Sequence, residues 1–136
     1  VAARIVRESE TVLYYLQQLS ALTFDAVQER EGDWVEDSDV TVAVDELLEE
    51  NGDYYAERLA TLSPMQRLLV SALAREPQKE FTAAYRRRHS LGASSTVHAS
   101  LKVILDGGLV ESDENGYFLG DPFFARYLRT MPYETA

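Results

Sequence analysis

The chain has 136 residues, of which 46% are hydrophobic and 26% are charged, so it can bury a core and is not a disordered polymer. It has no cysteine, which excludes disulfides and thiol chemistry and fits a cytoplasmic protein, and no apolar run approaches the roughly 20 residues of a membrane span. The net charge of -10 is uneven, because residues 1–62 carry 4 basic and 15 acidic side chains while residues 63–136 carry 9 and 8. The first part therefore repels a phosphate backbone, and the second part is nearly neutral.

The first part of the chain predicts an acidic helical bundle over residues 1–62. Apolar residues at helical spacing indicate three helices, over residues 10–27, 38–50 and 53–62. We expect Asp37 to cap the second of these helices. The pair Asn51-Gly52 is expected to end it, because both residues tolerate the left-handed conformation.

The second part, residues 63–136, predicts three more helices. The run Ser63-Pro64-Met65-Gln66 is the sharpest local signal, since a serine cap, a proline at the first helical position and a glutamine at the third form a capping box. The expected helices cover residues 65–76, 79–90 and 95–106. Ser94 is placed to cap the last of them, and Gly107-Gly108 is placed to end it.

The segment after these helices predicts a β-hairpin, the wing of a winged helix-turn-helix. Short strands are expected over residues 109–112 and 117–119, joined by a turn at Asn115-Gly116, where both residues accept positive φ. Asp121-Pro122 then opens a final helix. The fold class is therefore mainly α, with a small helical bundle followed by a winged helix that carries a short hairpin.

The helix expected after Ser94 is the candidate for nucleic-acid recognition. It is the second helix of the helix-turn-helix, which is the one that lies in the major groove when such a motif binds DNA. The outward residues that can contact base edges or phosphates are Ser95, Thr96, His98 and Lys102, next to the small Ala99. Residues able to clamp phosphates just before the turn are Arg86, Arg87 and Arg88.

A second interpretation of the same residues does not involve DNA. The predicted wing tip carries Asp113 and Glu114, where wings that contact DNA usually carry basic residues, and the reading helix has one lysine and no arginine. On this interpretation the three arginines are a solvated helix end, where cations favour the dipole, or a docking patch for an acidic partner.

The sequence shows no active site and no metal site. The only histidines are His89 and His98, there is no cysteine to complete a zinc site, and the carboxylates fit a solvated acidic face. No G-x-x-x-x-G-K-[ST] loop is present, so this chain does not bind a nucleotide by that route. The eight tyrosines favour packing in a core or an interface.

Three runs in this order, LATLSPMQRLLVSALA, GASSTVHASLKVILDGGLVE and GYFLGDPFFARYL, resemble the C-terminal part of the archaeal-type P-loop ATPases, which are AAA+/STAND-like proteins. In that family the ATPase module is followed by a helical lid and a winged helix, and the last strand runs into an aspartate-proline-phenylalanine element. The residues that match this element are Asp121, Pro122, Phe123 and Phe124. Ser95 and Thr96 match the reading helix, and the acidic first part is similar to the lid. Tyr127 departs from the family, which often has tryptophan after this element.

The resemblance implies that the chain is the non-catalytic C-terminal region of a longer ATPase, and the start at Val1 without a methionine agrees with that expectation. ATP and magnesium would then bind in a preceding domain and no cofactor would bind here. The winged helix would dock on its own nucleotide-binding domain or on a protein partner. The competing interpretations are a stand-alone winged-helix DNA-binding transcriptional regulator, with the bundle for dimerisation or sensing, and a pure protein-interaction adaptor. The partner and the oligomeric state stay open.

Overall fold

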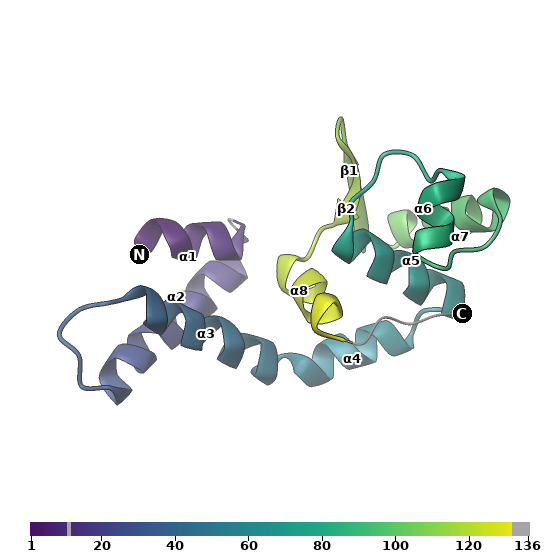
Figure 1. The fold of residues 1–136 in the computed structure, drawn as a ribbon. Coiled ribbons are helices and arrows are strands. Elements are labelled where there is room, and N and C mark those ends of the chain that lie inside the picture. Colours follow the sequence, from purple (N-terminus) through teal and green to yellow (C-terminus); the bar gives the residue numbers. More distant parts are fainter. Residues whose placement is uncertain (11, 132–136) are drawn as a thin grey trace. The chain divides into compact units, whose positions relative to one another are not determined.

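A computed structural model describes residues 1–10 and 12–131 of the chain (Figure 1). Within these residues the fold is mainly α with one short hairpin, which confirms the predicted fold class. The helices are α1 (Ala2–Ser9), α2 (Leu13–Glu29), α3 (Asp37–Glu50), α4 (Gly52–Ala60), α5 (Pro64–Arg75), α6 (Ala83–Arg88), α7 (Ser94–Asp106) and α8 (Pro122–Thr130). The strands are β1 (Val110–Asp113) and β2 (Gly116–Leu119). In the part of the chain that is described, no helix is both long enough and apolar enough to cross a membrane.

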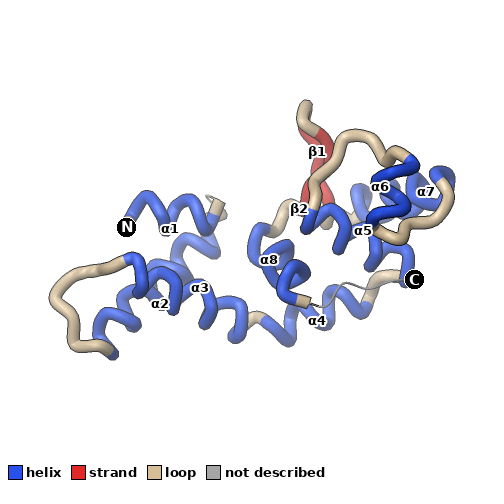
Figure 2. Tube along the Cα trace, viewed as in Figure 1, coloured by secondary structure: helices blue, strands red, loops and turns tan. Residues whose placement is uncertain are grey.

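The described residues divide into two compact units, one within residues 1–54 and one within residues 55–131. The first unit is built on α2 and α3, which pack along each other, and α1 packs against both (Figure 2). The buried side chains that hold this unit together are Tyr15, Leu19, Leu22, Ala26 and Val27 from α2, and Val40, Ala43, Val44 and Leu47 from α3. The apolar spacing in the sequence predicted most of this core.

Helix α1 was not predicted, because its stability comes from contacts that are distant in sequence. The side chain of Arg4 donates to the main-chain oxygen of Asp37 at 2.6 Å and to the hydroxyl of Thr41 at 2.9 Å. An eight-residue helix is too short to be stable alone, so these tertiary contacts are needed to hold it.

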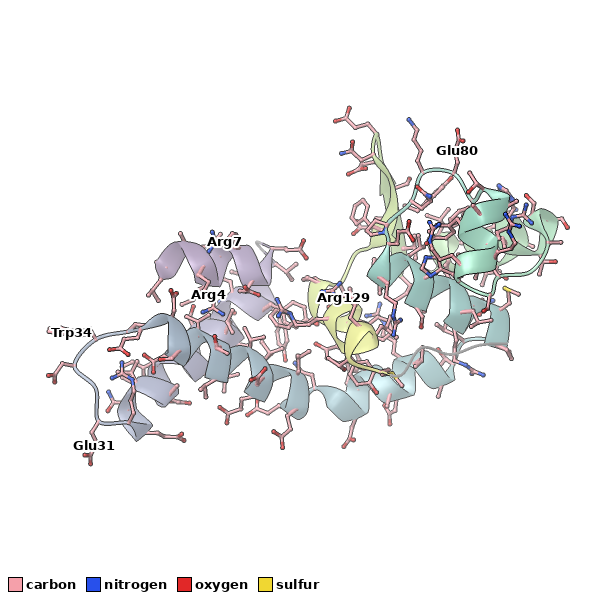
Figure 3. The ribbon with its side chains drawn as sticks, in the orientation of Figure 1. Arg4, Arg7, Glu31, Trp34, Glu80 and Arg129 are labelled. Atoms are coloured by element: carbon pink, nitrogen blue, oxygen red, sulfur yellow. The ribbon has the colours of Figure 1, made fainter. Side chains whose placement is uncertain are left out.

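The loop between α2 and α3 is held by one buried carboxylate. Asp39, only 2% exposed, accepts hydrogen bonds from Arg30 at 2.7 and 2.8 Å and from the main-chain N–H of Glu36 at 2.7 Å. Arg30 also donates to the main-chain oxygen of Trp34, which lies with Glu31 on this loop (Figure 3). The prediction that Asp37 caps α3 was therefore wrong by one residue, since Glu36 occupies the cap position.

The junction between α3 and α4 is not the left-handed stop that the sequence indicated. Asn51 has φ -94°, and Gly52 already belongs to α4. A single capping residue therefore separates the two helices.

The second unit contains the predicted winged helix. Helices α7 and α8 and strand β2 all pack on α5, whose capping box is confirmed: the main chain of Ser63 donates to Gln66 Oε1 at 3.0 Å, and Gln66 donates back to Ser63 Oγ at 3.3 Å. The strands pair antiparallel beside the helices, with Val110 opposite Leu119 and Asp113 opposite Gly116 (Figure 1). The predicted first strand was shifted by one residue from β1, and the predicted second strand was one residue shorter than β2.

Helix α6 is shorter than the predicted helix over residues 79–90. Thr82 caps it by accepting from the main chain of Tyr85 at 3.2 Å, and Ala84 is exposed. The segment before α6 pairs with the hairpin instead. Gln78 and Tyr117 exchange main-chain hydrogen bonds of 3.3 and 2.8 Å. This extra bridge joins segments 39 residues apart, and local sequence patterns do not reveal it.

Two further terminal predictions need correction. Helix α7 begins at Ser94 with Ala93 in the cap position, so Ser94 is not the cap. In the hairpin turn only Gly116 has positive φ, at 126°, whereas Asn115 does not. The stop at Gly107-Gly108 is as predicted, since Gly108 has φ 77°.

Helix α4 packs with the winged helix. Tyr55 is fully buried, with ring centroids 5.7 Å from Phe124 and 5.4 Å from Tyr127. Arg58 bonds to Asp121 at 3.3 Å. These contacts explain why the compact second unit begins at Tyr55.

Candidate interface of the winged-helix unit

The outward face of α7 is exposed and carries no acidic side chain before Asp106. The predicted contact residues Ser95, Thr96, His98 and Lys102 are all exposed, while Val97, Leu101 and Ile104 on the opposite side are buried. The structure therefore presents the residue types that the sequence selected. Their role as nucleic-acid contacts stays a prediction.

Two of the three arginines before the turn are engaged within the protein. The Nε of Arg86 donates to the main-chain oxygen of Phe81 at 3.2 Å. Arg88 donates to both carboxylate oxygens of Glu76, at 3.0 and 2.6 Å. Arg87 is exposed, and in the described part of the chain neither Arg87 nor Lys102 makes a side-chain hydrogen bond or ion pair. The cations free to meet a phosphate are thus fewer than the sequence indicated.

Glu76 is the centre of a polar cluster that the sequence did not reveal. Its Oε2 lies 2.7 Å from the Nε2 of His89, which is only 5% exposed, and its main-chain oxygen accepts from the hydroxyl of Tyr85 at 2.8 Å. Hydrogen bonds from Arg88 and His89 lower the pKa of Glu76. The cluster fastens the end of α5 to the end of α6, so the arginine run contributes to the fold itself.

His98 is held against an aromatic group between α7 and the wing. Its Nδ1 lies 2.7 Å from the main-chain oxygen of Ser94, and its ring meets Phe81 edge-on at 6.3 Å. Phe81 in turn stacks on Tyr117 at 5.7 Å. A shallow hollow of about 280 Å³ opens beside these rings; its other lining residues are Lys79, Glu80 and Thr82. Glu80 lies on the connection between α5 and α6 (Figure 3).

The wing presents carboxylates to solvent. Glu111, Asp113 and Glu114 are all exposed on or beside its two strands. Asp113 also accepts from the main-chain N–H of Asn115 at 2.8 Å, which fixes the turn. An acidic tip repels a phosphate backbone.

The aspartate-proline-phenylalanine element is part of the core and not of the exposed face. Asp121 caps α8 by accepting from the main-chain N–H groups of Phe123 and Phe124 at 3.1 and 3.0 Å. Pro122 occupies the first turn, and both phenylalanines are fully buried. The guanidinium of Arg58 lies over the Phe124 ring at 5.3 Å. This element therefore joins α4 to the winged helix.

Three helices with a hairpin after the third define this unit as a winged helix-turn-helix, a class that serves DNA binding or regulation through protein contacts. The chain belongs to the family described as a probable winged helix domain, which matches residues 53–130. The match begins at α4, in agreement with the packing of Tyr55 in the second unit. No curated protein and no solved structure matches the chain significantly. Among the described residues, no group of three or more side chains is arranged to hold a metal ion.

Proposed function

We propose that this chain is the C-terminal, non-catalytic region of a P-loop ATPase, in which the winged helix is a docking and regulatory module. The observation that carries the docking role is the distribution of charge on the second unit. Two of three arginines are bound to Phe81 and Glu76, and the wing is acidic. A surface of this kind suits a protein partner better than a phosphate backbone.

The attachment of α4 supports the regulatory part of the proposal. Helix α4 follows α3 after one residue, and Tyr55 and Arg58 fasten it to α8 through ring contacts and a 3.3 Å ion pair. A shift of α4 would therefore move the winged helix with it, since packed elements do not slide independently. Such a connection can carry a signal from a nucleotide-binding domain that precedes this region.

The reading frame upstream of Val1 tests the ATPase assignment. The proposal predicts a phosphate-binding G-x-x-x-x-G-K-[ST] loop roughly 200–250 residues before Val1, with ATP and magnesium held by that preceding domain. A frame that has no such loop upstream would remove the assignment. It would leave the winged-helix family and the docking surface untouched, because those rest on other observations.

A stand-alone DNA-binding regulator is the second candidate, and one observation favours it. The outward face of α7 has no acidic residue between Ser94 and Val103, and Lys102 makes no internal ion pair in the described part of the chain. This candidate predicts submicromolar duplex binding that weakens steeply with salt and is weakened by Lys102→Ala or Arg87→Ala. Arg7→Ala is the matched control, because it removes the same charge from the other unit. Binding that is equally strong in all three variants would count against DNA reading through α7.

A further inference from the structure

The outward face of α2 carries large apolar side chains that nothing in the first unit covers. Leu13 is 65% exposed and Phe24 is 61% exposed, although both are large apolar residues. One helical face runs between them, here called the α2 seam: Leu13, Leu16, Gln17, Ser20, Ala21 and Phe24. Exposed apolar residues that gather on one face typically mark an interaction surface.

The α2 seam is also free of charge, in the most highly charged part of the chain. Residues 1–54 carry 14 acidic and 3 basic side chains, yet residues 13–24 carry neither. On α2 the first charged residue is Asp25, directly after Phe24, and the next is Glu29, while the other carboxylates of this unit lie on or beside α1, α3 and α4 and in the loop before α3. A basic partner would require acidic residues around the apolar ones, so this face suits an uncharged surface.

The α2 seam can pair with a second copy of itself, because its residues are arranged symmetrically about its midpoint. The midpoint lies between Gln18 and Leu19, and in an antiparallel pair of helices Leu13 of one copy meets Phe24 of the other. The same operation places Leu16 against Ala21 and Gln17 against Ser20. Large side chains thus meet at both ends, and each middle pair sets a larger residue against a small one, which is compatible with helix axes about 8–10 Å apart.

We propose that the α2 seam is the interface of a homodimer, in which two copies of α2 pack antiparallel about a two-fold axis. This is an isologous contact, the commonest kind in soluble oligomers. It does not depend on the proposed function of the winged helix. The seam spans roughly 16 Å at 1.5 Å per residue, so the contact is small and we expect the dimer to be reversible.

The salt dependence of this dimer has a definite sign. Each first unit carries a net charge of -11, so two copies repel each other at low ionic strength. Salt screens this repulsion and leaves the uncharged contact in place. Dimerisation therefore strengthens as salt is raised, whereas binding to a basic partner would weaken.

Sedimentation velocity of the 136-residue chain, from about 10 to about 500 µM protein and from about 0.05 to about 1 M NaCl, tests the proposal. The wild-type chain is expected to move from monomer to dimer, more completely at high salt. Phe24→Glu and Leu13→Glu are each expected to weaken dimerisation at least about tenfold, because each puts a carboxylate into the contact. Both sites are exposed, and far-UV circular dichroism verifies that the variants fold.

Val42→Glu is the matched control, because Val42 is 49% exposed on α3 and points away from the Val40, Val44 and Leu47 core. It adds the same charge to the same unit and is expected to leave the dimer intact. A chain that stays monomeric at the highest protein and salt concentrations would overturn the proposal. So would a dimer that both seam variants leave unchanged, or one that Val42→Glu disrupts equally.

Discussion

Gly116 shows how one residue without a side chain fixes the position of the wing. Its φ is 126°, and a Cβ at this position would lie 2.6 Å from the main-chain oxygen of Gln78. The close approach is the bridge between Gln78 and Tyr117 that ties the hairpin to the connection after α5. The sequence identified Gly116 as a turn residue but gave no sign of this second constraint.

Gly116→Ala is expected to lower the free energy of unfolding by about 2 kcal/mol. The positive φ is unfavourable for alanine, and the new methyl group would collide with the main chain of Gln78. Urea denaturation followed by circular dichroism measures the change. Gly52→Ala is the control, since no atom lies within 4 Å of the added Cβ and the φ of Gly52 is ordinary. Equal stability of the two variants would show that the approach of Gln78 to Gly116 is not restrictive.

Asp39 gives the first unit a pH dependence at acidic pH. Hydrogen bonds from Arg30, and next from the main chain of Glu36, lower the pKa of Asp39 to about 2. An unfolded aspartate titrates near about 3.9. The folded state therefore binds fewer protons in this range, so the stabilisation is complete above about pH 4 and is lost as the pH falls through about 2.

Asp39→Asn is accordingly expected to destabilise the protein at pH 7 and to lose its effect toward pH 2. The difference in urea midpoint between wild type and variant, measured at several pH values, reports this one carboxylate against the background of the others. A difference that stays constant from neutral to acidic pH would contradict the predicted role of the Arg30 pair.

At the scale of elements, three local signals predicted contacts that the structure has, whereas the expected caps at Asp37 and Ser94 were each one residue off. The capping box at Ser63, the stop at Gly108 and the cap at Asp121 each involve residues within a few positions, and the structure has all three. The apolar face of α7 follows the same logic. Helix α1 and the Gln78–Tyr117 bridge depend on partners 33 or more residues away, so no local pattern could reveal them.

In the candidate site, too, some features follow from the local sequence and others depend on how the helices pack. The exposure of Lys102 and its neighbours on α7 follows from helical periodicity, which the sequence contains. The engagement of Arg88 by Glu76 depends on how α5 and α6 pack, and twelve residues separate the two side chains. Counting arginines in the sequence therefore overstated the positive charge that is free on this surface.

Asp121→Ala is expected to lower the free energy of unfolding by about 1 kcal/mol through loss of the α8 cap. A double-mutant cycle with Arg58→Ala measures the contact that joins α4 to α8. We expect the double variant to be less destabilised than the sum of the two single variants. Strict additivity would mean that the ion pair does not couple α4 to α8, and would count against the proposal that α4 carries a signal to the winged helix.

At the scale of the whole molecule, the two units differ in net charge, and this difference affects which partners each unit can bind. The first unit carries -11 and the second is nearly neutral, so any phosphate-binding surface would have to be in the second unit. There the winged helix has a fold that commonly binds DNA, but two of the three arginines in its run bond to Phe81 and Glu76 and its wing is acidic. We therefore infer that the fold serves protein contacts.

Selection from a pool of random-sequence DNA duplexes, followed by titration of the best duplex at about 0.05 and about 0.2 M salt, tests this inference most directly. The account predicts that no sequence is enriched and that binding stays in the non-specific range of about 10⁻⁴–10⁻⁶ M. Enrichment of one sequence that binds at submicromolar concentration, and that Lys102→Ala or Arg87→Ala releases, would contradict it.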